Sequence, residues 1–417
     1  MFKWYRSISL IIRIACGIVI GALLAVLVPQ WGFLGILGEL FIGALKAIAP
    51  LMVFFIIMSA LAQYETGTKN HFSTVIVLYM AATLIAALTA VAASYLFPVT
   101  IVLPKGTHVG SGIPKGLGPV IQNLLVNAVG NPLKAITNAN YLSILFWSLL
   151  FGVTLRKTGP NIRHSVKEIS DTIASVAQFI IQFAPFGIVG LVFNAVSETG
   201  FAGIIRYGQL VVLLVGTMAF VYLGVYAFMT WVMTGQNPYP LVLWTLKVSG
   251  IPAFFTRSSA VNIPINMQAS ADLGLDESSY SVSIPLGGSA NSGGAAVTIT
   301  VMTLAAAHTL GIAVSFPLAF ILCLLTAVSA TGASGIAGGS LLLIPMAASL
   351  FGISNDIAIE VVGVGFIIGV IQDSVETAVN SASDLLFTAV AEYHDEKKAG
   401  RPVDIAAAVH AANQKRH

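Results

Sequence analysis

Charged side chains are scarce in this chain. They make up 9% of its 417 residues, whereas a soluble globular protein carries roughly 25%. The mean hydropathy is +0.90, so there is too little charge to cover a water-exposed surface. The composition excludes a soluble enzyme, a soluble nucleic-acid reader and a disordered chain, and it predicts an integral membrane protein.

Cysteine is almost absent as well. Cys16 and Cys323 both lie in apolar stretches, so we expect neither a disulfide framework nor a thiolate metal site. The formal net charge of +3 is too small to indicate a polyanionic partner such as a nucleic acid. The chain also lacks the G-x-x-x-x-G-K-[ST] and H-E-x-x-H patterns, so ATP hydrolysis and zinc proteolysis have no support.

Long apolar runs dominate the first half of the chain. A membrane-spanning helix needs about 20 apolar residues, and the runs are continuous rather than alternating as in a membrane barrel. We therefore predict an all-α integral membrane protein. The candidate spans cover residues 8–28, 33–62, 72–98, 140–156, 168–197 and 205–234.

Basic residues predict the orientation of these spans, because cytoplasmic loops carry an excess of lysine and arginine. Basic residues occur near the N-terminus, at Lys69, between Arg156 and Lys167, and in the tail from Lys397. They alternate as expected if both termini are cytoplasmic and the long segment 99–139 lies outside. The basic residues thus predict that both termini lie in the cytoplasm.

Glycine clusters interrupt the apolar runs in the second half. Residues 278–355 contain no aspartate, glutamate, lysine or arginine, yet glycine-rich segments at 287–294 and 332–339 break the run. Such backbone survives at membrane depth only inside protein or beside a water-filled cavity. Paired interruptions point to the binding site of a secondary transporter. Small-residue turns at 256–260 and 329–334 each precede a polar segment and predict a weak internal repeat.

The strongest local signal is a polar stripe near the end of the chain. Its members recur at helical spacing: Asp373, Glu376, Thr377, Asn380 and Asp384. They fall on one helix face about 100° wide. An ionisable group inside a membrane costs at least ~2.5 kcal/mol unless it is paired or hydrated. Three acids in one stripe therefore predict a functional site rather than a packing surface.

Two further residues have the chemistry to join that site. Arg257, beside Ser258 and Ser259, can offset one of the acids, although an arginine near a membrane interface can also snorkel to headgroups. Asn291 lies at a predicted helix break, where free carbonyls can ligate a hard cation such as Na⁺. The alternative for Asn291 is a buried amide that links helices by hydrogen bonds.

An intramembrane serine protease is the enzymatic alternative. Ser289 could supply a nucleophile and His308 a base. A helix between them would separate the two by about 28 Å, far beyond the hydrogen-bond reach that such a dyad needs. We therefore expect that the protein is not an enzyme.

Four segments resemble, in order and spacing, the dicarboxylate/amino acid:cation symporters of the glutamate-transporter superfamily. They are Thr256–Ala260 (first hairpin tip), Pro285–Ala295 (the N-M-D-G-T helix break), Gly332–Gly338 (second hairpin tip) and Asp373–Asp384 (last helix). The resemblance covers about residues 8–390. It is greatest to the bacterial sodium:serine/threonine symporter branch, through Phe254–Ser259, Tyr280–Leu286, Gly339–Pro345, Phe351–Ile357 and Phe366–Gly369.

The resemblance implies eight transmembrane helices plus two re-entrant helical hairpins, with inverted repeats, in an elevator fold. It also implies a homotrimer in the lipid bilayer of the cytoplasmic (inner) membrane of a bacterium. Residues 1–71 and 99–200 would form a scaffold, with spans 1 and 2 in the first part and the outer segment with spans 4 and 5 in the second. Residues 72–98 and 201–390 would form the moving transport domain, and 391–417 a cytoplasmic tail.

The resemblance also implies roles for individual residues. Asp373 would hold the substrate ammonium and Asn380 the substrate carboxylate. The other residues implied around the substrate are Arg257, Ser258, Ser259, Ile336, Ala337, Gly338, Glu376 and Thr377. The implied Na⁺ ligands are Asp384, Asn380, Gly287 and Asn291 at one site, and Ser289, Ala330, Thr331 and Ala333 at another.

Departures from the family pattern bear on specificity. Glu376 stands where acidic-substrate members have an arginine, and Ala295 replaces an assisting threonine. A carboxylate at this place would repel glutamate and aspartate, and Glu376 could instead accept a substrate hydroxyl. Gly293 and Ser292 replace the aspartate and methionine of N-M-D-G-T. The missing acid removes a charged ligand of an additional Na⁺ site, so the number of coupled ions stays open.

These observations predict Na⁺-coupled symport of small neutral L-amino acids, L-serine and L-threonine first, into the cell. One alternative is a proton-coupled carrier in which Glu376 or Asp373 cycles its proton. Another is a channel-like or sensory protein that binds an amino acid without coupled uptake.

Overall fold

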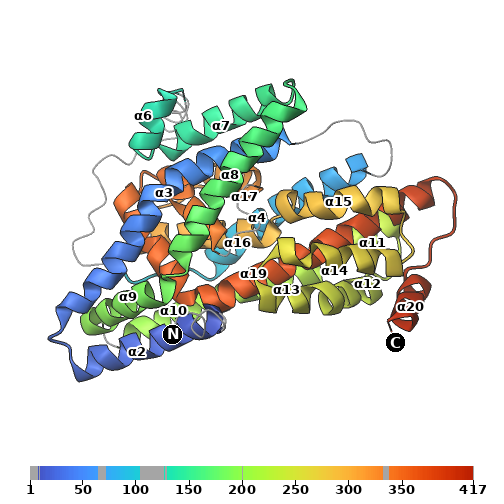
Figure 1. Ribbon diagram of the computed structural model, residues 1–417. Helices are drawn as coiled ribbons and strands as arrows, with labels where there is room; N and C mark the ends of the chain where they lie inside the picture. Colours follow the sequence, from blue (N-terminus) through green and yellow to red (C-terminus); the bar gives the residue numbers. More distant parts are fainter. Residues whose placement is uncertain are drawn as a thin grey trace.

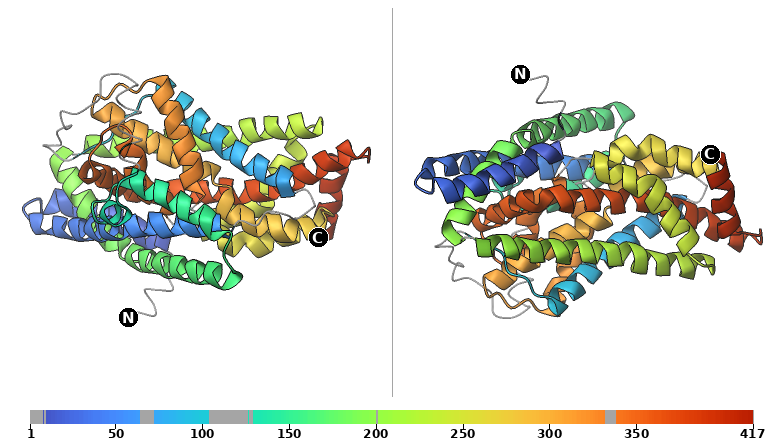
Figure 2. Two further views of the ribbon diagram at one scale, coloured as in Figure 1. Left: turned by 90° about the horizontal axis from the view of Figure 1, so that it is seen from above. Right: turned by 90° about the horizontal axis from the view of Figure 1, so that it is seen from below.

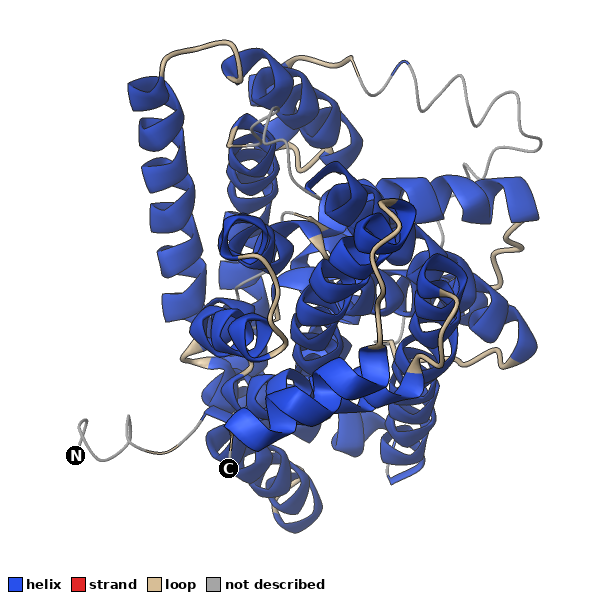
Figure 3. Ribbon diagram, turned by 90° about the vertical axis from the view of Figure 1, so that its right-hand side faces the viewer, coloured by secondary structure: helices blue, strands red, loops and turns tan. Residues whose placement is uncertain are grey.

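The computed structural model describes residues 8, 10–63, 72–103, 126, 129–199, 201–331 and 338–416. Every regular element within those ranges is helical, and none is a strand (Figure 3). The all-α prediction is therefore confirmed for the described part of the chain. Lys69 and most of the segment 99–139, on which the predicted orientation relied, lie outside the described residues.

The helices of the first half of the chain pack mainly on one another, except α4 (Phe72–Leu96), which packs on α16 (Gly293–Thr309), α17 (Phe316–Ala330) and α19 (Asn355–Lys398) of the second half. The elements of the first half are α2 (Leu10–Leu27), η1 (Gly32–Leu34), α3 (Gly35–Ala62), α4 (Phe72–Leu96), α6 (Pro132–Thr137), α7 (Tyr141–Leu155), α8 (Pro160–Ile181) and α9 (Ala184–Thr199). Helix α2 lies against α9, and α3 packs on α7, α8 and α9 (Figure 1). Small residues allow this closeness: a Cβ atom on Gly21 of α2 would lie 2.6 Å from the carbonyl oxygen of Val189 in α9. Such contacts are typical of helix pairs inside membranes.

The second half is more broken. It runs through α10 (Phe201–Phe220), η2 (Val221–Tyr226), α11 (Ala227–Thr234), α12 (Tyr239–Thr245), η3 (Leu246–Gly250), α13 (Ile251–Thr256), α14 (Ser259–Asp272), α15 (Glu277–Ala290), α16 (Gly293–Thr309), α17 (Phe316–Ala330), η4 (Gly339–Leu343), α18 (Ile344–Ser349), α19 (Asn355–Lys398) and α20 (Ile405–Lys415). The predicted break at Asn291 is confirmed, because α15 ends at Ala290 and α16 begins at Gly293.

Helices flank both places where hairpin tips were predicted. Helix α13 turns at Arg257 into α14, and we call residues 239–272 hairpin 1. Helix α17 packs against η4 and α18, and we call residues 316–331 and 338–349 hairpin 2. Residues 332–337, where the second tip was predicted, lie outside the described residues.

Helix α19 is the axis of the second half. It spans 44 residues, and helices flank it on both sides (Figure 2). Ser354 caps its start, with the side-chain oxygen accepting the Ile357 N–H, and Lys397 and Lys398 lie in its last turn, where cations complement the helix dipole.

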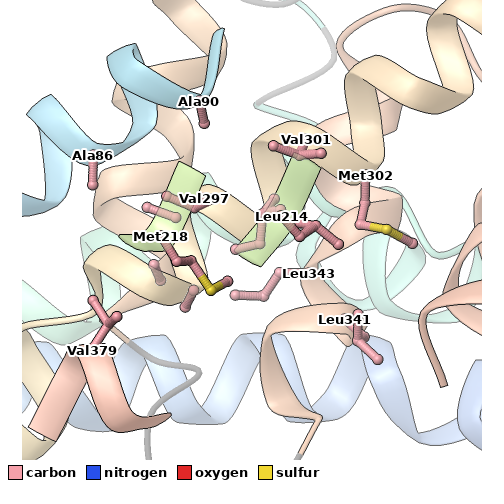
Figure 4. Packing of buried hydrophobic residues seen from close by; sticks show 14 of the residues in the cluster. Ala86, Ala90, Leu214, Met218, Val297, Val301, Met302, Leu341, Leu343 and Val379 are labelled. Atoms are coloured by element: carbon pink, nitrogen blue, oxygen red, sulfur yellow. The ribbon is translucent and has the colours of Figure 1, made fainter. Parts of the chain in front are cut away.

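Helix α16 forms the centre of the buried core, since all residues from Gly293 to Ala307 are buried. Figure 4 shows its apolar side chains among those of α4, α10, η4 and α19. The labelled members are Ala86, Ala90, Leu214, Met218, Val297, Val301, Met302, Leu341, Leu343 and Val379.

Length and composition identify which described helices could cross a membrane. Among the described residues, five helices are long and apolar enough to cross a membrane, or six if the bent pair α8 and α9 counts as one span. The chain is therefore a multi-pass membrane protein, while the count of eight spans stays a prediction. The candidate span 168–197 falls on the pair α8 and α9, which meet at 52° and form either a broken span or a re-entrant loop. Pro185 supplies a physical reason: it has no N–H to continue the hydrogen-bond ladder and clashes with the preceding turn.

Helix α20 docks at the end of hairpin 1, where the C-terminus lies in Figure 1. Arg416 Nε donates to Asp272 Oδ2 at 2.6 Å, and the indole N–H of Trp244 donates to Asn413 Oδ1 at 3.1 Å. The predicted tail thus contains a helix packed on hairpin 1. The division of the chain into scaffold and transport domains stays a prediction.

Candidate functional site

The polar stripe of α19 faces the protein interior. Asp373, Glu376, Asn380 and Asp384 are all at most 6% exposed, as the helical spacing predicted. The buried acids of the stripe need polar partners at membrane depth. The partners come from hairpin 1, the Asn291 break, α16, Gly338, η4 and Gln372 of α19 itself.

Asp373 joins the two hairpins. Its Oδ2 accepts a hydrogen bond from Arg257 Nε at 2.6 Å, within a salt bridge whose side chains are 4% and 8% exposed. Its Oδ1 accepts the backbone N–H of Gly338 at 2.9 Å. Arg257 is the turn of hairpin 1, and Gly338 immediately precedes η4 of hairpin 2. One carboxylate therefore ties the Arg257 turn and the start of η4 to α19.

The backbone at Arg257 is left-handed, with φ 52° and ψ 34°. Among the described residues, only Arg257 and Ala139 have positive φ without being glycine. This region is disfavoured for a residue with a Cβ atom and persists only where the surroundings enforce it. The side-chain Nη1 of Arg257 is buried and has no hydrogen-bond partner in the described part of the chain.

Glu376 is held by hydrogen bonds alone. Its Oε2 accepts from Thr298 Oγ1 at 2.7 Å, from Ser340 Oγ at 2.8 Å and from Gln372 Nε2 at 2.6 Å. Within the described residues it has no salt-bridge partner. The three donors lie on α16, η4 and the preceding turn of α19. Sequence reasoning missed all three, although Gln372 is four residues before Glu376 and therefore on the same helix face.

Asn380 contacts the start of α16. Its Oδ1 accepts the backbone N–H of Gly294 at 2.8 Å, which satisfies one of the free donors at a helix N-terminus. Only glycine fits here, because a Cβ atom on Gly294 would lie 2.8 Å from the Glu376 carbonyl oxygen. The bond directs the amide oxygen of Asn380 at the helix break and leaves its amide NH₂ group for another acceptor.

Asp384 lies beside the break between α15 and α16. Asn291 Nδ2 donates to Asp384 Oδ1 at 2.9 Å and to Ser383 Oγ at 2.7 Å. No basic side chain pairs with Asp384 in the described residues, and Asn291 Oδ1 is buried without a hydrogen-bond partner. A Cβ atom on Gly287 would lie 2.7 Å from Asp384 Oδ1, so the glycine lets the backbone approach the carboxylate. A buried carboxylate and an unpaired amide oxygen are the hard oxygen donors that suit an alkali or alkaline-earth cation.

Tyr79 of α4 contacts the same region. Its hydroxyl donates to the carbonyl oxygen of Asp384 at 3.1 Å and to that of Ser283 at 3.2 Å. The backbone N–H of Ser292 donates to Thr83 Oγ1 at 3.4 Å. Helix α4 therefore contacts both the break and α19.

The hydroxyl groups of the other predicted site residues make mostly local hydrogen bonds within their own helices or turns. Ser258 caps α14 through the Val261 N–H at 3.3 Å, and Ser259 is buried. The Thr377 hydroxyl donates to the Asp373 carbonyl oxygen at 2.8 Å, and the Thr331 hydroxyl donates to the Val328 carbonyl oxygen at 2.7 Å. Ala330 is buried at the end of α17. The predicted positions Ala333, Ile336 and Ala337 and the side chain of Ser289 lie outside the described residues.

A second polar network, which sequence reasoning missed, attaches hairpin 1 to α19. Asn262 Nδ2 donates to Ser381 Oγ at 2.7 Å, and Asn266 Nδ2 donates to the Ser381 carbonyl oxygen at 3.0 Å. Ser249 Oγ lies 3.2 Å from Ser381 Oγ. The network is fully buried. It fixes the height of the Arg257 turn along α19.

Comparison with known proteins identifies the family of this chain. The model of the Sodium:dicarboxylate symporter family matches residues 10–393. A protein of Lacticaseibacillus paracasei named serine/threonine transporter SstT is 64% identical over 414 residues, covering 99% of this chain and 95% of its own length. Proteins of the same name from Enterococcus faecalis and Streptococcus agalactiae are each 55% identical, covering 98% and 94% of this chain and 97% of their own lengths. The chain belongs to the sodium:dicarboxylate symporter family.

Proposed function

We propose that this protein takes up L-serine and L-threonine together with Na⁺ across the cytoplasmic membrane of a bacterium. The names of the relatives support the substrate class. The observation that carries the proposal is the environment of Glu376. A buried carboxylate held only by three neutral donors repels a second carboxylate, so it disfavours acidic amino acids.

The amino acid would bind along α19. Asp373 accepts the ammonium group, and the free NH₂ group of Asn380 donates to the carboxylate. Arg257, Ser258, Ser259 and Thr377, with the segment from Ile336 to Gly338, would enclose the substrate. The hydroxyl of serine or threonine can join the hydrogen bonds around Glu376, since a carboxylate oxygen accepts more than one.

Na⁺ would travel with the substrate, bound near the break between α15 and α16. Asp384, Asn291, Asn380 and the Gly287 backbone are the proposed ligands of one ion. Support comes from the unpaired Asn291 Oδ1 beside a carboxylate without a basic partner. Ser289, Ala330, Thr331 and Ala333 are the proposed ligands of a second ion. Each ion adds positive charge next to a stripe with three acids, which lowers the cost of burying them.

The movement would follow an elevator mechanism in a homotrimer, with both termini in the cytoplasm. Residues 1–71 and 99–200 would stay fixed while 72–98 and 201–390 move. Lys46 of α3 and Asp356 of α19 form an exposed ion pair between these two groups. An exposed pair contributes only about 0–1 kcal/mol, so it can break when the groups slide.

Uptake into proteoliposomes tests the proposal. We expect serine accumulation with an inward Na⁺ gradient and little in choline, and equal uptake in both would reject Na⁺ coupling. Uptake driven by a pH gradient without Na⁺ would favour the proton-coupled alternative. Serine binding without accumulation would favour a channel or sensor. Liposomes that contain the Asp373→Asn protein serve as the matched control for serine uptake that does not depend on the proposed site.

A further inference from the structure

The carboxylate proposed to bind the substrate ammonium already has a cationic partner in the protein. Arg257 Nε lies 2.6 Å from Asp373 Oδ2, and both side chains are almost fully buried. An incoming ammonium group and the guanidinium therefore compete for the same oxygen. This inference rests on the proposed function, because it concerns how a substrate reaches Asp373.

Charge balance decides which ligands can compete. A buried charge that loses its only partner is strongly unfavourable. A cationic amine that displaced Arg257 would leave the guanidinium without a counter-charge. A zwitterion brings its own carboxylate, so the displaced guanidinium finds a new partner and the site stays neutral.

Arg257 has a free donor for that carboxylate. Nη1 is buried and makes no hydrogen bond within the described residues, and guanidinium groups bind carboxylates well. The nearest alternative acid along the stripe, Glu376, already accepts three hydrogen bonds from neutral donors. Nη1 therefore has no internal carboxylate assigned to it.

The backbone holds the guanidinium at this place. The left-handed conformation of Arg257 ends α13, and its N–H donates to the Ala253 carbonyl oxygen at 2.8 Å. The neighbouring network of Asn262, Asn266 and Ser381 anchors the hairpin to α19. Because the backbone of the turn is fixed, only the guanidinium end of the Arg257 side chain needs to move when it exchanges partners.

We propose that Arg257 determines specificity for zwitterions by exchanging ion-pair partners with the substrate. The substrate ammonium displaces Arg257 Nε from Asp373 Oδ2. The released guanidinium then pairs with the substrate carboxylate. Two buried ion pairs replace one, and no charge is left alone. A ligand with only an ammonium or only a carboxylate cannot complete the exchange.

Three probes and three variants test the exchange in purified full-length protein with Na⁺ present. L-serine is the zwitterion, ethanolamine is serine without its carboxylate, and glycerate is serine with its ammonium replaced by a hydroxyl. Affinities come from isothermal titration. We expect the wild-type protein to bind serine at least about tenfold more tightly than either single-charge probe.

Removing the guanidinium should change the preference for serine over the single-charge probes, and not only the affinity for serine. Arg257→Gln leaves Asp373 without its partner, so the ratio of ethanolamine to serine affinity should rise at least about tenfold. Arg257→Lys keeps the charge and should keep the wild-type preference. Arg401→Gln, which removes an arginine from an exposed ion pair, is the matched control and should change nothing.

The outcomes separate this inference from the proposed function. If wild-type protein binds serine but Arg257→Gln keeps the wild-type ratio, the exchange is wrong and the proposed function stands. If wild-type protein binds ethanolamine as tightly as serine, the exchange is wrong even where Arg257→Gln fails to fold. If wild-type protein binds no serine at all, the proposed function fails and the inference with it.

Discussion

The phenolic oxygen of Tyr226 fills the space that a side chain at Gly293 would need. A Cβ atom on Gly293 would lie 1.9 Å from that oxygen. The hydroxyl is buried and has no hydrogen-bond partner among the described residues. A phenol from η2 thus occupies the space beside the helix break, and a side chain larger than glycine at position 293 has no room there.

The first prediction follows from this contact. Gly293→Ala should destabilise the protein by about 1–3 kcal/mol, because an added methyl group overpacks a filled core. Tyr226→Phe removes the obstructing oxygen, so the double variant should regain most of the loss. Thermal unfolding in detergent measures both. Gly216→Ala is the control, since a Cβ atom there meets nothing within 4 Å; equal effects at Gly293 and Gly216 would contradict the packing argument.

Asp373→Asn should lower serine affinity at least about a hundredfold. The amide cannot balance an ammonium group, and it leaves Arg257 as a buried charge without a partner, a loss of about 3 kcal/mol or more. Titration calorimetry in Na⁺ buffer gives the affinity. Asp356→Asn alters an exposed acid on the same helix and should bind serine normally. Unchanged affinity in Asp373→Asn would show that another group binds the ammonium.

Asp384→Asn should weaken the binding of Na⁺ rather than the binding of the amino acid. Without the carboxylate, the Na⁺ concentration that half-saturates serine binding should rise about tenfold or more, equivalent to about 1.4 kcal/mol. Serine affinity at saturating Na⁺ should change much less. Titrating Na⁺ at fixed serine measures the shift, with Asp395→Asn in the same helix as the control. A Na⁺ dependence identical to wild type would remove Asp384 from the ion site.

Glu376→Gln should weaken the rejection of acidic amino acids. Glutamine keeps one oxygen for the three donors around this position, so the fold should survive, while the repelling charge is gone. The affinity ratio of L-aspartate to L-serine should rise at least about tenfold. Competition with labelled serine uptake measures the ratio, with the exposed Glu277→Gln as the control. If the ratio stays at the wild-type value, the exclusion of acidic substrates depends on another residue.

Much of the site was predictable because its signal is local. The helical spacing from Asp373 to Asp384 predicted one buried face of a helix, and the break at Asn291 followed from its glycine neighbours. The bend between α8 and α9 was missed although Pro185 marks it, because the apolar run of 168–197 continues through the proline. Thr298 and Ser340 were missed because an isolated hydroxyl in an apolar helix has no pattern that points to a distant carboxylate.

Composition was enough to require a multi-pass membrane protein, because 9% charged residues cannot solvate a surface of this size. Periodicity was enough to require a buried polar stripe, because residues three and four apart share a helix face. Which partners that stripe meets was decided only by the tertiary structure. Arg257 and Asp373 are 116 residues apart in the chain, and they meet because hairpin 1 packs along α19 and turns at a left-handed residue. Long-range pairings of this kind depend on how the helices pack against one another, and no local pattern in the chain encodes that packing.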